Sequence, residues 1–214
     1  MKKRIVLLGP PASGKGTQAE LIQKRFAIPA TSTGAILRGE AKGGTLIGVA
    51  ANKIINRGGL APDGLILQLV AEWLDRIGGS FLFDGFPRTV AQAEQFELLL
   101  DNRPARVELV IFLEISGETI RARMLRRLTC SNCGKVISIA RHVRDGGDPC
   151  PNCDGKLEAR EDDTDAALER RMQEYREKTL PVTDFYKRRG ILARLDGDRG
   201  AESVFSDVSR LIIE

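Results

Sequence analysis

The sequence predicts an α/β fold in which helices cover both faces of a parallel sheet. Short apolar runs of buried-strand character alternate along the chain with segments whose apolar residues recur at helical spacing. Consecutive parallel strands need a crossover connection, and a helix is the usual one. Ligands of such folds bind at the carboxyl ends of the strands, so we expect the functional residues there.

The chain opens with a strand, a loop and a helix. Residues 4–8 form a continuous apolar run that ends at glycine and proline, and Ala19, Ile22 and Phe26 then recur at helical spacing. Residues 1–8 also resemble the start of a signal peptide, but their apolar run is too short for one. We therefore assign them to the first core strand.

A second helix and three further strands follow. Pro62 suits a first helical turn and precedes an amphipathic stripe in which Trp73 is expected to be core. The apolar runs at 81–83 and 107–113 predict buried strands, each followed by a helical segment, and 191–195 predicts another strand. Together with the first strand, these runs supply the parallel sheet.

Two stretches interrupt this alternation. Residues 32–62 contain many glycines and predict short helices. Residues 127–163 contain the cysteines together with glycines, prolines and charges, and they lack a helical stripe. Because neither stretch continues the pattern of strands and helices, we interpret both as insertions on the core.

Composition limits the possible classes of protein. The 33 lysines and arginines exceed the 29 acidic residues only slightly. This excess suits phosphate-bearing ligands or a solvated basic face and is too small for a nucleic-acid arm. No stretch approaches the roughly 20 apolar residues of a membrane span. We expect a soluble protein with neither a nucleic-acid nor a membrane partner.

A glycine-rich loop follows the first strand and opens the first helix, which is the context of a phosphate-binding P-loop. Its backbone amides and the helix amino terminus offer donors to phosphate oxygens, and Lys15 can reach the outer phosphates. The alternative is a glycine-rich turn with a chance lysine. The loop expected to bind ATP consists of Gly9, Pro10, Pro11, Ala12, Ser13, Gly14, Lys15, Gly16 and Thr17.

Four segments together resemble the adenylate kinase family of nucleoside monophosphate kinases. The loop has that family's form, Gly16-Thr17, where other P-loops have a hydroxyl residue directly after the lysine. The order of the segments and the six-residue central signature make the resemblance specific, and it spans nearly the whole chain. The segments are Gly9 to Gln18, Ser32-Thr33-Gly34 with Arg38, Asp84-Gly85-Phe86-Pro87-Arg88-Thr89, and Arg160 with Asp162-Asp163.

The resemblance implies a P-loop NTPase-type core whose five-stranded parallel sheet is flanked by helices and carries two mobile insertions. The core would comprise residues 1–31, 64–126 and 164–214. Residues 32–63 would form an AMP-binding insertion, and residues 127–163 a zinc-ribbon lid that closes over ATP. The two irregular stretches found above fit these insertions.

The same resemblance implies which residues contact the nucleotides. Those expected to act in catalysis are Lys15, Arg88, Arg123, Arg127, Arg160 and Arg171. The ATP site would comprise the loop together with Arg123, Arg127 and Arg199. The AMP site would comprise Thr33, Gly34, Arg38, Gly59, Ala61, Gly85, Arg88, Gln92, Arg160 and Arg171.

Some of these residues have structural alternatives. Arg123 and Arg127 follow a predicted helix start near Gly117, and basic residues near a helix carboxyl end interact favourably with its dipole. For the neighbouring Arg126 we prefer that structural role. Thr89-x-x-Gln92 fits a capping box, in which Gln92 would bond the backbone amide of the threonine and need not touch adenine.

Phosphoryl transfer explains the need for so many arginines. The reaction brings two polyanions together, and planar guanidinium groups neutralise charge on the transferred group. Alignment and preorganised charge should supply most of the rate, without a covalent protein intermediate. The resemblance implies Mg²⁺ bound with ATP, and Asp84, which ends an apolar strand, would orient waters around it. The alternative is that Asp84 has a structural role, as a helix cap or a turn residue.

The spacing of Cys130-x-x-Cys133 and Cys150-x-x-Cys153 is that of a four-thiolate zinc ribbon. Four thiolates fill a tetrahedral shell, so the site would be structural, and iron or cobalt could replace zinc. Two disulfides are the alternative, and they need an oxidising compartment. Because no cysteine lies elsewhere in the sequence, we expect a reducing, cytoplasmic location. The only histidine, His142, is expected at the surface.

Four positions depart from the residues usual in the family. Ala12 stands where a loop glycine is common, and it would be strained if the backbone there needs a positive φ. Ala35 replaces an aspartate beside the acceptor motif, and Gly64 replaces a glutamate. Arg126 replaces a glycine where the lid begins. An arginine there would stiffen the hinge of the lid or move the hinge by one residue.

The function predicted from the resemblance is reversible phosphoryl transfer from ATP to AMP, giving two ADP, by a monomeric enzyme. Thr33 and Gln92 favour AMP as the acceptor. One alternative is a kinase of UMP, CMP or GMP with the same chemistry. Another is a zinc-ribbon NTPase that binds nucleic acid, although the lid lacks the interleaved aromatic residues of such proteins.

Overall fold

The five-stranded sheet is parallel throughout, as the alternation of strands and helices predicts. Its strands follow the order β2-β3-β1-β4-β8. They comprise Arg4–Leu8 (β1), Ala30–Ser32 (β2), Phe81–Asp84 (β3), Leu109–Glu114 (β4) and Leu192–Asp196 (β8). The computed structural model describes residues 1–45, 62–103, 105–124, 126–138, 149–159 and 165–214.

Sequence periodicity located four of these strands and missed β2. This strand has three residues, all partly exposed, so it presents no apolar run. β1 has the predicted bounds, whereas β4 begins two residues after the start of the 107–113 run and β8 one residue after that of 191–195. The fifth strand, which the family resemblance implies, is an edge strand beside β3.

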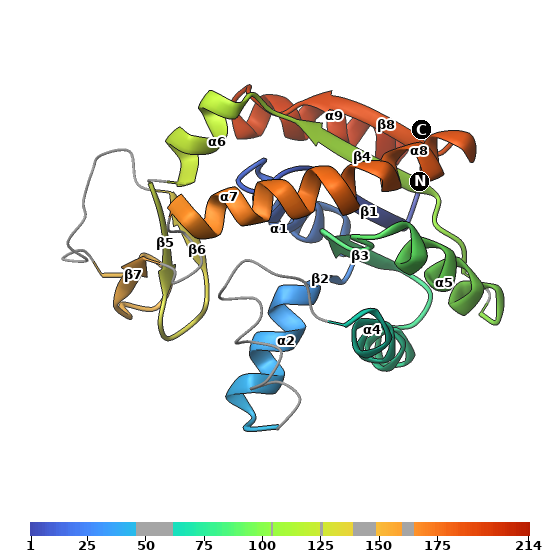
Figure 1. Cartoon of the computed structure of the whole chain (residues 1–214), viewed down its shortest axis with the longest axis horizontal. Helices are drawn as coiled ribbons and strands as arrows, with labels where there is room; N and C mark the ends of the chain where they lie inside the picture. The colour runs from blue at the N-terminus through green and yellow to red at the C-terminus, as the bar shows by residue number, and fades with distance from the viewer. Residues whose placement is uncertain (46–61, 104, 125, 139–148, 160–164) are drawn as a thin grey trace.

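Alternate residues of β1 pack on opposite faces of the sheet, because side chains alternate along a strand. Val6 and Leu8 belong to one apolar cluster, and Ile5 and Leu7 belong to another. Helices cover both clusters, as Figure 1 shows. The first is covered by α4 (Asp63–Ile77), α5 (Val90–Asp101) and α8 (Leu180–Arg188), and the second by α1 (Lys15–Phe26) and α9 (Ala201–Ile213).

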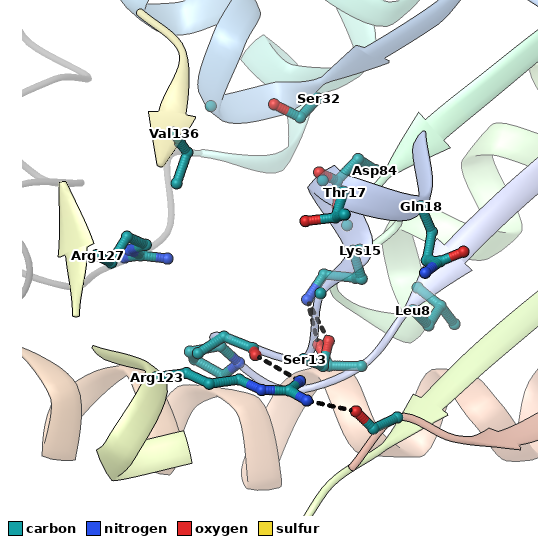
Figure 2. Close-up of a pocket in the computed structure, with 18 of the residues that line it drawn as sticks. Leu8, Ser13, Lys15, Thr17, Gln18, Ser32, Asp84, Arg123, Arg127 and Val136 are labelled. Carbon is teal, nitrogen blue, oxygen red and sulfur yellow. Dashed lines mark hydrogen bonds between the residues drawn. The ribbon is translucent and has the colours of Figure 1, made fainter. Parts of the chain in front are cut away.

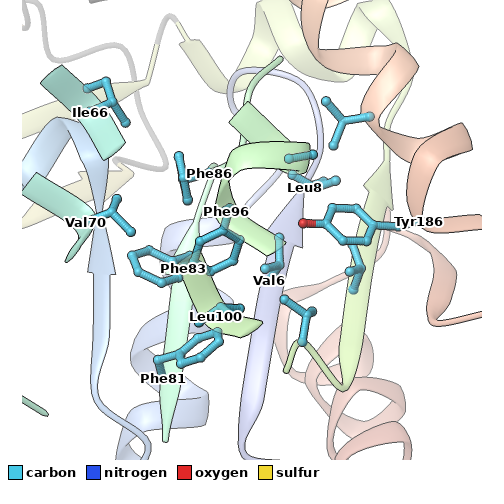
Figure 3. Packing of buried hydrophobic residues seen from close by; sticks show 14 of the residues in the cluster. Val6, Leu8, Ile66, Val70, Phe81, Phe83, Phe86, Phe96, Leu100 and Tyr186 are labelled. Atoms are coloured by element: carbon cyan, nitrogen blue, oxygen red, sulfur yellow. The ribbon is translucent and has the colours of Figure 1, made fainter. Parts of the chain in front are cut away.

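Phenylalanine rings occupy the centre of the first cluster (Figure 3). Phe83 contacts Phe81, Phe86 and Phe96, with ring centroids 5.4 Å apart in each pair. Trp73 packs edge-on against Phe83 at 5.1 Å and is partly buried, which confirms its expected place in the core. Because Phe83 directly precedes the last residue of β3, this packing fixes the end of that strand.

The glycine-containing stretch after β2 begins with a helix, α2 (Thr33–Lys42), as predicted. The other short helices expected in this stretch fall on 46–61, outside the described residues. Pro62 then caps α4 and does not lie inside its first turn. Its missing amide hydrogen is tolerated there, since the first amides of a helix have no intrahelical partner.

The cysteine-containing stretch forms a second, antiparallel sheet of order β6-β5-β7. Its apolar cluster is small and is formed by Leu128 and Leu157 together with Cys130 and Cys150. In Figure 1 this sheet lies at one end of the molecule, beside α6. The elements here are α6 (Gly117–Met124), β5 (Arg127–Cys130), β6 (Val136–Ser138) and β7 (Leu157–Ala159).

A long helical segment returns the chain from the second sheet to the core. It consists of α7 (Asp165–Glu174), a π-helical turn η1 (Tyr175–Thr179) and α8. Neither this segment nor any other helix among the described residues has the length and apolar content of a membrane span.

Candidate active site

A cavity of about 590 Å³ opens at the carboxyl ends of β1 and β3, where a parallel sheet is expected to bind ligands. The glycine-rich loop contributes every residue from Gly9 to Thr17 except Pro10. Gly85 lines the cavity beside Asp84. Five arginines also line it, and they are Arg88, Arg123, Arg127, Arg171 and Arg199.

The loop depends on backbone conformations that glycine adopts most easily. Gly9 has a φ of 148°, and a Cβ there would lie 2.6 Å from the carbonyl oxygen of Leu113. Gly14, with a φ of 91°, caps α1, whose first amides are donors suited to phosphate. Ala12 has a φ of 60°, so the backbone strain expected for an alanine at this position is present.

Lys15, the first residue of α1, turns its ammonium group back onto the loop (Figure 2). Its Nζ donates to the carbonyl oxygens of Gly9 and Pro10 at 2.9 and 2.8 Å and to Ser13 Oγ at 3.1 Å. Burial lowers the pKa of Lys15 to about 8, and the carboxylate of Asp84 opposes that shift. The ammonium group therefore lies where phosphate oxygens can replace its present acceptors.

Three arginines from separate parts of the chain line the same cavity as Lys15. Arg88 follows β3, Arg127 begins β5, and Arg171 lies on α7. The positive charge of each lowers the pKa of Lys15 further. The cations that line this cavity outnumber its carboxylates, so a polyanion would bind favourably among them.

Two further arginines hold the rim of the cavity. Arg123 Nη2 donates to the carbonyl oxygen of Gly197 at 2.8 Å. Arg199 Nη2 donates to Asp207 Oδ2 at 2.6 Å, which ties the loop after β8 to α9. Arg126, for which the sequence favoured a structural role, is exposed and does not line the cavity.

Asp84 ends β3 and lines the cavity, as predicted. A Cβ atom placed on Gly16 would lie 3.4 Å from Asp84 Oδ2. Gly16, which stands where other P-loops have a hydroxyl residue, therefore leaves space beside the carboxylate. A carboxylate beside a phosphate-binding loop offers the oxygen ligands that Mg²⁺ requires, with room for several waters. The residues present therefore fit a magnesium–nucleotide complex.

The residues expected to bind the acceptor are only partly gathered at the cavity. Gly34 lines it, whereas Thr33 is buried at the start of α2 and does not. Residues Gly59, Ala61 and Arg160, and the side chain of Arg38, lie outside the part of the chain that the structure describes.

Gln92 turns inward and does not line the cavity. Thr89 Oγ1 accepts a hydrogen bond from the Gln92 amide at 3.0 Å, as in a capping box. Gln92 Oε1, however, accepts a hydrogen bond from the amide of Arg88 at 2.8 Å. The prediction that it would bond the amide of Thr89 is therefore wrong. The reason is that Asp63 Oδ1 holds the other end of the side chain, Nε2, at 2.6 Å.

The four cysteine sulfurs lie within 4.8 Å of one another, and all four thiols are free. Cys130 Sγ is 3.5 Å from Cys153 Sγ, and Cys133 Sγ is 3.8 Å from Cys150 Sγ. A tetrahedron with metal–sulfur bonds of about 2.3 Å has edges of roughly 3.8 Å, so the spacing suits a four-thiolate metal site. His142, expected at the surface, lies outside the described residues.

Sequence reasoning missed several residues that line the cavity. Gly197 follows β8, and a Cβ there would lie 2.9 Å from Ile115 Cγ2, so the position requires glycine. A glycine directly after a predicted strand could have indicated this. Other missed residues lie on α1, on α9, on or just before β6, and on α7 and η1, where no sequence pattern distinguished them. They include Glu20, Lys135, Val136, Glu174, Tyr175, Thr179 and Val204.

Comparison with known proteins agrees with this arrangement. Residues 7–191 match the family model described as adenylate kinase. The chain is 37% identical over 211 residues to an adenylate kinase of Clostridium botulinum, with 98% of each chain covered. It is 35% identical over 210 residues to one of Syntrophobacter fumaroxidans, covering 97% of this chain and 99% of the relative.

A relative from another organism gives the same result. The chain is 37% identical over 212 residues to an adenylate kinase of Methanocella arvoryzae, with 98% of both chains covered. These matches extend over the loop, the central signature, the arginines and the cysteine-containing sheet together. The chain therefore belongs to the adenylate kinase family of enzymes, which transfer phosphoryl groups to nucleoside monophosphates.

Proposed function

We propose that this chain transfers the γ-phosphoryl group of ATP to AMP and, in reverse, makes ATP and AMP from two ADP. The observation that carries the proposal is that Arg88, Arg127 and Arg171 line one cavity together with Lys15 and that each acts on its pKa. Two polyanionic nucleotides meeting at this point would neutralise that charge. The transferred group would pass between them in line, through a transition state whose charge these cations stabilise.

The donor, ATP, would bind to the loop of residues 9–17 and to Arg123, Arg127 and Arg199. Backbone amides at the start of α1 would donate to phosphate oxygens, and Lys15 would exchange its loop carbonyl acceptors for the outer phosphates. A negative ligand also raises the pKa of Lys15, which keeps the ammonium group charged when ATP is bound.

The acceptor, AMP, would bind on the opposite side, between α2 and the segment that follows β3. The proposed contacts include Gln92, whose side-chain amide already bonds Arg88 and Asp63. A contact between Gln92 and adenine would therefore require one of these two bonds to break. The full set proposed for this site is Thr33, Gly34, Arg38, Gly59, Ala61, Gly85, Arg88, Gln92, Arg160 and Arg171.

The second sheet would act as a lid over ATP. Residues 127–163 would move as one body, and β6 already places Val136 at the cavity wall. The neighbouring Lys135 has its Nζ 3.9 Å from Oε2 of Glu20 on α1, and this ion pair links the sheet to the core. Closing the lid would exclude water that would otherwise accept the phosphoryl group.

Two metals fit the chain. Asp84 would hold waters of a Mg²⁺ ion, which supplies neutralisation of phosphate charge when it is bound with ATP. The four cysteines would hold a structural Zn²⁺, with iron or cobalt as other metals that thiolates accept. Four protein ligands leave no open coordination position, so this site would stabilise the lid and take no part in the reaction.

A panel of acceptors tests the proposal. With ATP as donor, kcat/KM is measured for AMP, UMP, CMP and GMP, and we expect AMP to be preferred. If the enzyme prefers another monophosphate, AMP is not the main acceptor, but the proposed phosphoryl transfer still stands. Lys15→Ala should remove most turnover while circular dichroism shows an unchanged fold, and normal turnover in that variant would overturn the site assignment.

A further inference from the structure

The backbone of Arg88 is held by two side chains that come from different parts of the chain. Thr179 Oγ1 donates to the carbonyl oxygen of Arg88 at 3.0 Å. The amide of Arg88 donates to Gln92 Oε1 at 2.8 Å, and its side-chain Nε donates to the carbonyl oxygen of Gly85 at 2.9 Å. The place of this arginine at the cavity wall therefore depends on a residue 91 positions away.

Thr179 ends the π-helical turn η1. The amide of Leu180 donates to the carbonyl oxygen of Tyr175, five residues earlier, instead of the usual four. Pro181 follows at once and has no amide hydrogen, so regular helical bonding cannot continue across this point. A π turn inside an α-helix is uncommon and is frequently found at functional sites.

The π turn changes which residue faces the cavity. Arg171, Glu174 and Tyr175 line the cavity at ordinary helical spacing, and a regular helix of about 3.6 residues per turn would place residue 178 at the centre of that face and Thr179 toward its edge. With the wider turn, Thr179 lines the cavity and Lys178 does not. One helical segment thus carries Arg171 and also the hydroxyl that holds Arg88.

We propose that Thr179 is a positioning residue for the binding of the acceptor monophosphate, acting through the carbonyl of Arg88. This inference rests on the proposed function, because it takes Arg88 as a contact of that monophosphate. Without the hydroxyl, the amide of Arg88 stays bonded to Gln92, but its carbonyl loses its donor and the residue can shift. Small displacements of a group that binds a reacting phosphate lower affinity and rate.

The chain offers a matched control one turn later. Thr183 Oγ1 donates to the carbonyl oxygen of Leu180 at 2.8 Å, and the residue is 2% exposed. Thr183→Val and Thr179→Val each replace a helical hydroxyl by a methyl group, but only the second removes a bond to Arg88. Thr179→Ser keeps the hydroxyl and should restore the wild-type behaviour.

Steady-state kinetics of these variants test the proposal, with thermal melting as a check of folding. Thr179→Val should raise KM for the acceptor about fivefold, as expected for one lost hydrogen bond of ordinary strength, with KM for ATP nearly unchanged. Thr183→Val and Thr179→Ser should behave as wild type. If the melting temperature of Thr179→Val is below that of Thr183→Val, Thr179→Ala replaces Thr179→Val in the kinetic comparison.

A double-mutant cycle separates action through Arg88 from direct contact with the acceptor. In an Arg88→Ala background, which removes the guanidinium group that the carbonyl bond positions, Thr179→Val should add no further rise in acceptor KM. The inference is overturned if the full rise persists in that background, or if the Thr179 and Thr183 variants behave alike. Failure of the proposed function would appear differently, as wild-type enzyme that phosphorylates no monophosphate, and the comparison uses whichever monophosphate the wild type accepts.

Discussion

Arg123 Nη2 donates to the carbonyl oxygen of Gly197 at 2.8 Å, across 74 residues of sequence. Nη1 of the same guanidinium group lies 3.4 Å from the carbonyl oxygen of Ala12. Arg123 thus joins α6, the phosphate loop and the loop after β8 at the rim of the cavity. Carbonyl oxygens occupy the directions in which phosphate oxygens would bind, so ATP would replace them as acceptors.

Arg123→Ala should weaken the ATP site and spare the acceptor site. We expect KM for ATP to rise about tenfold or more, because hydrogen bonds to charged groups contribute about 1.5–3 kcal/mol. Arg126→Ala is the matched control, since Arg126 is exposed and does not line the cavity, and it should stay within about twofold of wild type. Equal effects in the two variants, measured by initial rates, would contradict the assignment of Arg123.

The pKa of Lys15 predicts an alkaline limb in the pH–rate profile. Burial lowers this pKa from 10.5 to about 8, and the ammonium form is the one that binds phosphate. As pH rises through about 8, the free enzyme loses that charge, so kcat/KM for ATP should fall with a midpoint near pH 8. A profile that stays flat to pH 10 would show a lysine with an ordinary pKa.

Removing the metal should loosen the second sheet selectively. Among the described residues, the buried part of its apolar cluster is Leu128, Leu157 and two cysteines, with Ile137 and Cys153 partly buried against them. Thiolate coordination would therefore supply much of its folding free energy. Calorimetry of chelator-treated enzyme should show a new transition at lower temperature, and proteolysis should begin within residues 127–163. Adding Zn²⁺ back should reverse both changes. Identical melting with and without metal would rule out the structural role.

Ala12→Gly should stabilise the protein. Ala12 has a φ of 60°, a conformation that costs an ordinary residue about 1–2 kcal/mol, and glycine avoids most of that cost. After the entropy that glycine adds to the unfolded chain, a net gain of about 1 kcal/mol is expected in urea unfolding at unchanged m-value. Ala19→Gly, inside α1, is the control and should destabilise the protein. A loss of stability in Ala12→Gly would contradict the strain.

Local patterns in the sequence were sufficient for most of the core. Apolar runs marked β1, β3 and β4 because strands buried on both faces need continuous apolar residues. The edge strand β8 is partly exposed, but its Leu192, Ala193 and Leu195 still left an apolar pattern. The same reasoning failed for β2, whose residues Ala30–Ser32 are partly exposed at the sheet edge and held by pairing with β3. A short edge strand carries too few buried side chains to leave a pattern.

The site was predictable where function depends on motifs and unpredictable where it depends on packing. The loop, Asp84 and the cysteine pairs have fixed spacings, so the sequence displays them. The bond from Thr179 to Arg88 depends on a π turn and on helix docking, and the partner of Gln92 depends on Asp63, which is 29 residues away. Such contacts arise only when separate elements meet in the folded chain.

We propose above all that a phosphoryl group passes directly between two nucleotides held in one cavity. The most direct measurement supplies purified enzyme with ADP and Mg²⁺ alone and follows all phosphorus species by ³¹P NMR. We predict ATP and AMP in equal amounts, with no inorganic phosphate above the rate without enzyme. Release of inorganic phosphate, or no conversion of ADP, would contradict direct transfer at this site.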